Sequence, residues 1–426
     1  MEHGLNTAAV AVTAACVVLW AVLSGRLERL NISAPIAFVC LGVLVTHKPF
    51  QLVDVRLHSA DLLTLAEVTL ALVLFVDASR VKVRALRRDV GGPVRLLGVG
   101  LPLTIGFGTA LAFMLFGGID GWVAATIGAI VAPTDAALGA PILQDTRVPL
   151  RIRRLLNVES GLNDGIATPF VNLFLAGAAV TESVAKTGIG HAALALVTGA
   201  SIGLGTGMAG ALLLVLAEKR RWSAPAFRSL GVLGLALFAY ASALQAGGNG
   251  FVAAFVAGLG FGALMPEGER LTLGFTDNAG ELLTLLVWFM FGATMLVPGF
   301  EHAGWQDVVF AVGALTIVRM VPVGLSLLGS GLDRATVAFV GWFGPRGLAS
   351  VVFALIATDS LAPSDANRVL AAVTVTVALS VAAHGVSASP LAARYGRREG
   401  AVSREEPSDV HVPVVRSLAG NRPGRQ

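Results

Sequence analysis

Long apolar runs separated by short polar stretches make up almost the whole chain. An α-helix needs about 20 mostly apolar residues to cross the hydrocarbon core of a bilayer. The pattern predicts thirteen such helices, at residues 6–24, 32–46, 59–78, 93–116, 121–143, 154–179, 189–217, 226–245, 249–265, 279–298, 305–329, 335–357 and 366–388. After Tyr395 the chain becomes polar, which predicts a transmembrane domain over 1–395 and a short cytoplasmic tail over 396–426.

Composition agrees with an all-α, polytopic membrane protein. Hydrophobic residues make up 55% and charged residues 14% of the 426 residues, whereas a soluble domain has about 25% charged residues. The pI of about 9.5 does not indicate a nucleic-acid partner, because the basic residues lie in short loops between predicted helices. Cys16 and Cys40 fall within apolar runs, so we expect neither a disulfide framework nor a Cys/His metal site.

The distribution of Lys and Arg predicts the orientation in the membrane. With thirteen spans the termini lie on opposite sides, and most of the 31 basic residues fall on one of them. The opposite side has only Lys48, Arg56, Lys186 and Arg368. Because cytoplasmic loops are rich in Lys and Arg, we expect a plasma-membrane protein with its N-terminus outside and its C-terminus in the cytoplasm. The first ten residues lack a basic region, so the first span is expected to remain as an uncleaved helix.

The sixth span contains an unusual polar motif, NVESGLNDGIATP, at residues 157–169. Residues four apart share a helix face, so Ser160 and Asp164 line one stripe and Glu159 and Asn163 line the next. A charged side chain at mid-membrane depth costs roughly 2.5–3.5 kcal/mol on insertion scales. We therefore interpret the motif as a cation and proton site. The alternative is a buried network that serves only the structure.

The fifth and twelfth spans are both interrupted by Gly and Pro. The fifth reads GAIVAPTDAALGAPIL and has Thr134 and Asp135 directly after Pro133; the twelfth reads GWFGPRGLASVVFAL and has Arg346 at its interruption. Broken helices expose backbone oxygens that suit an alkali cation, and the Asp135 carboxylate suits the N-terminus of a half-helix. The alternative for the fifth span is a proline kink with Asp135 capping its second half. Matching breaks in two halves predict an inverted-repeat transporter, with spans 1–6 repeated as spans 8–13.

Two further ionisable residues lie well inside spans. Arg319 in the eleventh span must have a partner, and Glu67, Asp135, Glu159 and Asp164 are the candidates. Glu67 in the third span is either functional or held by a structural hydrogen bond.

The remaining sequence contains little other chemistry. We interpret the isolated His191, His302 and His384 as interfacial or packing residues. The sequence has no HExxH, P-loop or GxSxG motif, so we expect neither an enzyme nor a cofactor.

Four of these motifs together resemble those of a known transporter family. They are APTDAA at 132–137, NVESGLNDG at 157–165, the span around Arg319 and WFGPRG at 342–347. The chain resembles Na+/H+ antiporters of the cation:proton antiporter superfamily, in the NhaP-like and Na+/H+ exchanger branch, over nearly its whole length. The resemblance implies two broken helices that cross in a six-helix core domain, about 93–179 and 305–388. The other helices would form a scaffold that makes a homodimer.

The same resemblance implies roles for individual residues. Asp164 resembles the ion- and proton-binding carboxylate, Ser160 and the backbone around Thr134 resemble further cation ligands, and Glu67 resembles an outer or water-mediated ligand. Asp135 of the same TD element is also a candidate ion-binding residue. Asn163 resembles an amide that holds the unwound part of span five, Glu159 and Arg319 a buried ion pair, and Arg346 an arginine near helix ends at the crossing.

The implied function is exchange of Na+ or Li+ for H+ by competition at Asp164, and the Asn-Asp pair resembles the electroneutral branch. One alternative is a K+/H+ antiporter of the same fold, which ion competition would distinguish. The other is a membrane sensor or scaffold that does not transport. Such a protein would have no need of the buried charges in span six.

Overall fold

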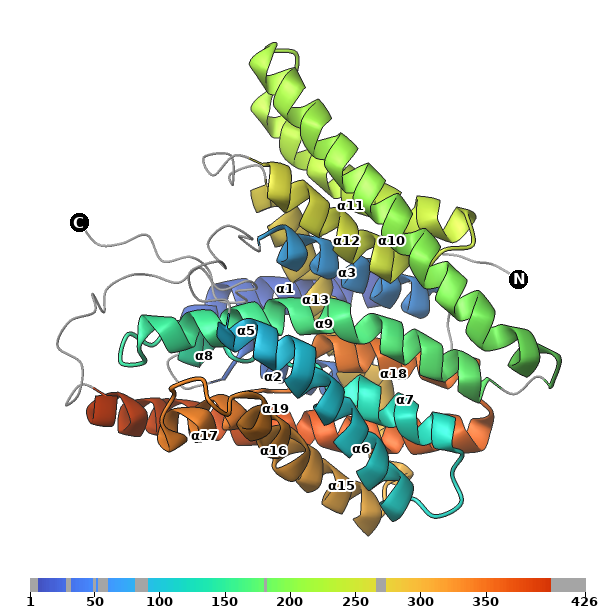
Figure 1. Cartoon of the computed structure of the whole chain (residues 1–426), viewed down its shortest axis with the longest axis vertical. Coiled ribbons are helices and arrows are strands. Elements are labelled where there is room, and N and C mark those ends of the chain that lie inside the picture. The colour runs from blue at the N-terminus through green and yellow to red at the C-terminus, as the bar shows by residue number, and fades with distance from the viewer. Residues whose placement is uncertain are drawn as a thin grey trace.

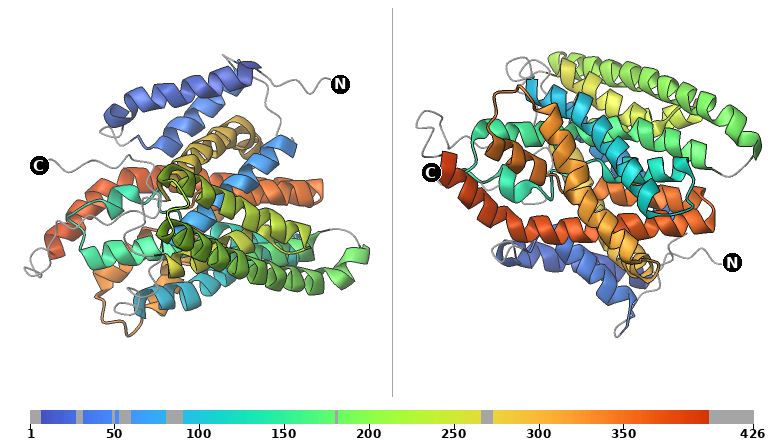
Figure 2. Two further views of the ribbon diagram at one scale, coloured as in Figure 1. Left: turned by 90° about the horizontal axis from the view of Figure 1, so that it is seen from above. Right: turned by 60° about the horizontal axis from the view of Figure 1, so that its bottom comes forward.

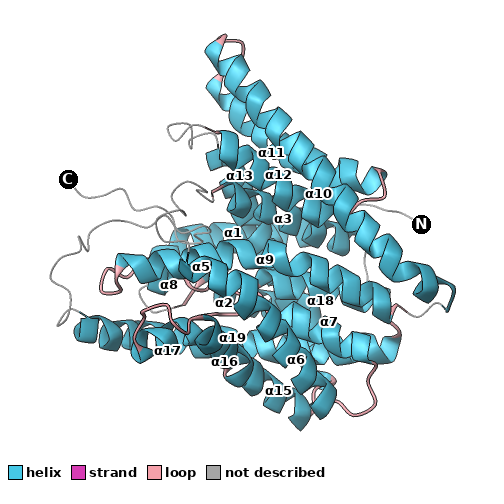
Figure 3. Ribbon diagram, in the orientation of Figure 1, coloured by secondary structure: helices cyan, strands magenta, loops and turns pink. Residues whose placement is uncertain are grey.

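The computed structural model describes residues 7–27, 32–48, 51–52, 60–80, 91–179, 182–265 and 273–399. Every regular element within these ranges is a helix, as the all-α prediction requires (Figure 3). The helices lie side by side as one bundle, and the pair α10 and α11 extends farthest from it (Figure 1).

Each of the thirteen predicted spans falls on helical chain in the described ranges. The first seven are α1 (Thr7–Leu27), α2 (Ala34–Thr46), α3 (Ala60–Ser79), α5 (Gly91–Arg95) with the π-helical η2 (Leu96–Gly100) and α6 (Leu101–Leu115), α7 (Gly121–Val131) with α8 (Ala140–Leu143), α9 (Leu150–Ala178) and α10 (Glu182–Lys219). The last six are α11 (Pro225–Gln245), α12 (Gly250–Leu264), α13 (Gly274–Met290) with η4 (Phe291–Leu296) and α14 (Val297–Glu301), α15 (Trp305–Leu315) with α16 (Ile317–Ser326), α17 (Arg334–Trp342) with α18 (Leu348–Ser360), and α19 (Pro363–Glu399).

Eight of the described helical segments are long and apolar enough to cross a membrane. Four others, α2, α7, α12 and α18, are apolar but shorter. Two of these, α7 and α18, are halves of the interrupted spans. Each is therefore long enough to cross only part of the bilayer. The remaining span is α9, whose 29 residues include the polar motif.

The contacts between helices divide most of them into two groups. Figure 2 shows the bundle from two further sides, with α1 and α2 at the edge away from α10. One group contains α3, α10, α11, α12 and α13, with α2 against α13. Small residues bring its backbones close: a Cβ on Gly203 or Gly207 of α10 would lie within 2.3 Å of the Ala253 or Ala257 carbonyl of α12. The other group contains α6, α7, α9 and α15 to α19. The division of the chain into a core and a scaffold domain, which the family resemblance implies, stays a prediction.

Both predicted helix breaks are present, and they meet. The chain leaves α7 after Val131 and α17 after Trp342, and α18 starts at Leu348. The Asp135 N–H donates to the Pro345 carbonyl at 2.7 Å, so the two irregular segments cross in direct contact. A third interruption, at Thr316 between α15 and α16, was not predicted.

The predicted start of the tail lies inside a helix, because α19 continues to Glu399. Residues 400–426 of the predicted tail lie outside the described residues, as do basic loop positions such as Lys82, Arg84, Arg87 and Arg270.

Candidate functional site

The polar motif of α9 faces the break that follows α7. Thr134, in that break, has its hydroxyl 3.0 Å from the Ser160 hydroxyl, and the Asn163 amide N–H donates to the same Thr134 oxygen at 2.6 Å. Ser160 and Asn163 are three residues apart, so neighbouring turns of α9 hold one threonine between them. All three side chains are buried. The motif of span six and the TD element of span five are therefore parts of one cluster.

Asp164 belongs to the same face of α9. It follows Asn163, lies four residues after Ser160, and its side chain is 7% exposed. The carbonyl oxygen of the Asn163 side chain is buried and, among the described residues, accepts no hydrogen bond. A buried acceptor without a donor costs free energy. The cluster thus combines a carboxylate, two hydroxyls and an amide oxygen, which are hard oxygen ligands of the kind that bind Na+ or a similar cation.

Glu159 and Arg319 form a buried ion pair between α9 and α16. The guanidinium donates to both carboxylate oxygens, Nη1 to Oε1 at 2.5 Å and Nη2 to Oε2 at 2.9 Å. The two side chains are 3% and 4% exposed. Of the four acidic candidates for Arg319, the structure places Glu159 against it. The backbone at Gly344 also lies against this pair, since a Cβ there would be 2.5 Å from Arg319 Nε and 2.9 Å from Thr134 Cγ2.

Asp135 uses its carboxylate at the crossing of the broken helices. Oδ1 accepts from the Ala137 N–H at 2.7 Å, and Oδ2 accepts from the Leu348 N–H, the first residue of α18, at 2.9 Å. The charge therefore lies at the N-terminus of the opposite broken helix, where the helix dipole favours it. The sequence alternative, in which Asp135 only caps the second half of span five, does not include this contact with α18. The role of Asp135 as an ion ligand stays a prediction.

Arg346 makes the reciprocal contact. Its guanidinium is fully buried and donates to the carbonyls of Ala132 at 3.0 Å and Pro133 at 3.4 Å, which are left open where α7 ends. It also donates to the Ala314 carbonyl at 3.3 Å, next to the interruption between α15 and α16. The backbone oxygens of Ala132 and Pro133 thus face a guanidinium. In the irregular segment after α7, Thr134 is the residue that contacts Ser160.

The charged side chains of this region leave an excess of negative charge. Asp135, Glu159 and Asp164 are acidic and Arg319 and Arg346 are basic, and each of the five is at most 7% exposed. When all five are ionised, the group has one more negative than positive charge. One bound monovalent cation or one proton would make it neutral, which removes the large cost of burying a net charge.

Glu67 lies apart from these contacts. It is half-buried in α3 and accepts a hydrogen bond from the Tyr240 hydroxyl of α11 at 3.0 Å. The structure thus provides the structural hydrogen bond that the sequence left open. A ligand role for Glu67 stays a prediction.

His384 fits the packing alternative, since its ring lies against the Trp342 ring, and it makes hydrogen bonds that the sequence did not predict. It is 3% exposed and is not interfacial: its imidazole Nε2 lies 2.8 Å from the Trp342 carbonyl, where α17 ends. Ser380, one turn earlier in α19, accepts from the backbone N–H of Arg346 at 2.7 Å. The local sequence of α19 does not indicate that His384 binds the end of α17, because Trp342 lies about 40 residues away in the chain. The only sequence signal is the four-residue spacing of two polar residues in an apolar span.

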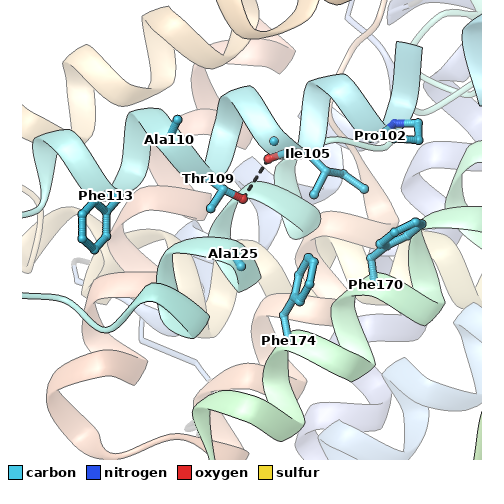
Figure 4. A pocket seen from close by; sticks show the side chains of 9 residues that line it. Pro102, Ile105, Thr109, Ala110, Phe113, Ala125, Phe170 and Phe174 are labelled. Atoms are coloured by element: carbon cyan, nitrogen blue, oxygen red, sulfur yellow. Dashed lines mark hydrogen bonds between the residues drawn. The ribbon is translucent and has the colours of Figure 1, made fainter. Parts of the chain in front are cut away.

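An open apolar groove of about 470 Å³ lies on the outside of α6, α7 and α9 (Figure 4). Phe113, Phe170 and Phe174 line it together with small and aliphatic residues, and its one hydroxyl, on Thr109, donates to the Ile105 carbonyl of its own helix. None of the candidate site residues lines this groove. The polar cluster is therefore enclosed between helices.

Comparison with known proteins agrees with the geometry. A family model described as "Sodium/hydrogen exchanger, transmembrane" matches residues 12–394. The K(+)/H(+) antiporter NhaP2 of Shewanella sp. (strain ANA-3) is 25% identical over 333 residues, which are 77% of this chain and 57% of that protein. The Na(+)/H(+) antiporter ApNhaP of Aphanothece halophytica is 25% identical over 71% of this chain and 59% of its own length. The chain thus spans less than two thirds of either relative.

Among solved structures, the sodium proton antiporter MjNhaP1 from Methanocaldococcus jannaschii at pH 8 has a similar fold. The TM-score is 0.73 at 20% sequence identity, over 91% of this chain and 98% of that chain. At this identity the similarity describes the fold.

Proposed function

Because the chain belongs to the sodium/hydrogen exchanger family, we propose that it exchanges Na+ or Li+ for H+ across the plasma membrane, with Asp164 as the shared binding group. Asp164, Ser160 and Thr134 bind the cation in this proposal, and Asn163 fixes Thr134. Asp135 and Arg346 hold the two broken helices, and Glu159 and Arg319 join α9 to α16. Glu67 is an outer ligand that a cation reaches through water.

The observation that carries the proposal is the junction of α9 and the α7 break. The side chains of Thr134, Ser160 and Asn163 contact one another there, with Asp164 buried next to them in the sequence of α9, and among the described residues the Asn163 Oδ1 lacks a donor. A purely structural network would be expected to satisfy its buried acceptors internally. A site for a cation leaves acceptors open toward the place that the cation occupies.

Exchange follows from competition at one carboxylate. A proton or a cation can neutralise the buried group of charges, but both together would make it positive. The charged, empty form is unfavourable inside the membrane because it buries a net charge that neither a cation nor a proton balances. One cation is therefore exchanged for one proton, and the cycle moves no net charge.

Movement of the core helices against the scaffold helices would expose the site to each side in turn. We expect two copies of the chain to associate through the scaffold, in contact with surrounding lipid. The basic loops support an external N-terminus and a cytoplasmic C-terminus.

The first test compares the wild-type protein with Asp164→Asn in proteoliposomes that contain a pH-sensitive dye. We expect Na+ or Li+ to drive proton movement in the wild type, and we expect Asp164→Asn to lose it while remaining folded. Asp145→Asn is the matched control: its carboxylate lies in a loop and binds Arg147. Normal cation-driven proton movement by Asp164→Asn would contradict the proposal.

The same assay shows which of the cations Na+, Li+ and K+ drives proton movement. A response to Na+ or Li+ that is unchanged when the membrane potential is imposed or clamped supports electroneutral exchange. A response to K+ alone would keep the site and change the substrate, as the name of the Shewanella relative suggests. The absence of any response from folded protein would favour a sensor or scaffold.

A further inference from the structure

Side chains on one face of α19 form hydrogen bonds at the break between α17 and α18, which spans residues 343–347. The polar side chains Ser380, His384 and Ser387 are four and three residues apart and so lie on one side of the helix. We call these three residues the α19 stripe. Each contacts a group at or next to the break: Ser380 the Arg346 N–H, His384 the Trp342 carbonyl, and Ser387 the indole N–H of Trp342.

The contacts satisfy backbone groups that the break leaves without helical partners. The Trp342 oxygen can only accept, so the 2.8 Å contact is a hydrogen bond when His384 carries its hydrogen on Nε2. Nδ1 of the same ring lies 2.8 Å from the Ser380 carbonyl and 3.2 Å from its hydroxyl. The imidazole also packs on the Trp342 ring, with centroids 5.3 Å apart. The end of α17 is thus fixed both by hydrogen bonds and by ring packing.

The α19 stripe connects to the cation site through direct contacts. Ser380 holds the backbone of Arg346, and the Arg346 side chain holds the carbonyls of Ala132 and Pro133. The next residue is Thr134, which contacts Ser160 and Asn163. Gly344 gives a second link, since the break lies against Thr134 there. A shift of the break relative to α19 would therefore displace Thr134 from its position on α9.

We propose that Ser380 and His384 are positioning residues for cation binding, which hold the α17–α18 break so that Arg346 keeps Thr134 against Ser160 and Asn163. This inference rests on the proposed function, because Thr134 is taken there as a ligand. Neither residue touches the cation: each acts through the backbone of the break.

The test uses two substitutions that remove the contacts and one that retains part of them. Ser380→Ala removes the acceptor for the Arg346 N–H. His384→Phe keeps a ring against Trp342 and removes both hydrogen-bonding nitrogens. His384→Gln retains an N–H donor that can reach the Trp342 carbonyl. The controls are Thr376→Val, buried on the same helix with its hydroxyl bonded to the Ala372 carbonyl, and His302→Phe, exposed at the end of α14.

Cation-driven proton movement in proteoliposomes then gives the apparent KM for Na+ and the maximal rate. We expect Ser380→Ala and His384→Phe to raise the apparent KM about two- to tenfold, the range that the loss of one buried hydrogen bond predicts. His384→Gln should restore most of the affinity, and both controls should match the wild type. A general loss of folding would lower the maximal rate and leave KM unchanged in the surviving protein. Unchanged KM in both folded variants would overturn the inference.

Amide hydrogen exchange of the intact protein gives a readout that does not depend on transport. The peptide covering residues 343–350 should exchange faster in Ser380→Ala and His384→Phe than in the wild type and the controls. If the wild type moves no cation, the proposed function fails, and faster exchange of this peptide would still support the contact of the α19 stripe. If exchange of the peptide is unchanged, the inference fails whatever the transport result. Should one variant fail to fold, the other is measured in the same way.

Discussion

Glu159 and Arg319 show how a single charged residue depends on its partner inside the membrane. Their contact is bidentate and almost completely buried, and Gly344 lies against the guanidinium. Moving both charges out of water is costly, and the attraction between them offsets that cost only while both are present. The pair therefore joins α9 to α16 without being a strong net source of stability.

Glu159→Ala should lower the free energy of unfolding by about 3–5 kcal/mol, because Arg319 remains buried without its counter-charge. Thermal unfolding in detergent or nanodiscs measures this. Arg398→Ala is the control, since it removes an exposed ion pair with Asp333 and should change the melting temperature little. The double variant Glu159→Leu/Arg319→Met should recover part of the loss. A melting temperature of Glu159→Ala equal to that of the wild type would argue against the pair.

At the scale of residues, the sequence predicted which charged side chains are buried better than what they contact. Charges within apolar spans are conspicuous, so Glu159, Asp164, Arg319 and Arg346 could be identified from their positions in those spans. The Asp135 contact with α18 required knowledge of which helix ends meet. For His384 the sequence left an interfacial and a packing role open, and the structure shows the packing role together with hydrogen bonds, because an imidazole in an apolar span has no local feature that indicates its partners.

At the scale of helices, the two broken spans cap each other. The Asp135 carboxylate binds the first N–H of α18, and the Arg346 guanidinium binds the last carbonyls of α7. Each charge lies at the helix end whose dipole it complements. The two half-helices are therefore stable inside the membrane as a pair.

Gly347 is essential to this arrangement. A Cβ there would lie 2.0 Å from Asp135 Oδ2, so Gly347→Ala must push the carboxylate away from α18. We expect a loss of about 1–3 kcal/mol in the free energy of unfolding, typical of overpacking, together with loss of cation exchange. Gly324→Ala in α16 is the control, because no atom lies within 4 Å of its added methyl, and it should be neutral or slightly stabilising. Full exchange activity in Gly347→Ala would contradict the role of the crossing.

The breaks at Pro133 and Pro345 could be predicted because Gly and Pro interrupt helices locally. The interruption at Thr316 could not. Its sequence, GALTIVRM, lacks proline and, apart from Thr316 and Arg319, is apolar. The carbonyl of Ala314 instead accepts from Arg346, which lies in another helix pair. Such an interruption depends on a partner that is distant in sequence, and a local pattern contains no information about it.

At the scale of the whole molecule, the candidate site lies close to where the two helix groups meet. Gly165, the residue after Asp164, lies directly against the ring of Phe255 in α12, and a Cβ on Gly165 would be 2.1 Å from that ring. Alternating access requires this surface to move. At this point the contact is between the bare backbone of Gly165 and the flat ring of Phe255.

Gly165→Ala should therefore lower the rate of exchange more than it changes the apparent affinity for the cation, because the Thr134, Ser160 and Asn163 contacts remain. Phe255→Leu in the same protein should restore part of the rate, since it makes room for the methyl. A double-mutant cycle over these two positions measures the coupling. Strictly additive effects on the rate would show that the two residues do not act together.

The number of spans could be predicted because each apolar run has the length that a bilayer imposes. The packing of helices such as α10 and α12 could not be predicted from their residues. A span that is apolar on every side has no polar face that indicates its neighbours. The division into core and scaffold was available only from the resemblance to a family, and the domain boundaries remain to be tested.

The mutual capping of α7 and α18 also has a consequence for biosynthesis. Asp135 and Leu348 are 213 residues apart in the chain, so the end of α7 is made well before its partner. At typical synthesis rates the interval is roughly 10–40 s. Throughout it, the open carbonyls of α7 and the Asp135 carboxylate must be solvated by water or by the insertion machinery. A ribosome stalled before Arg346 would therefore leave an incompletely inserted fifth span, which makes this nascent chain a natural substrate for membrane quality control.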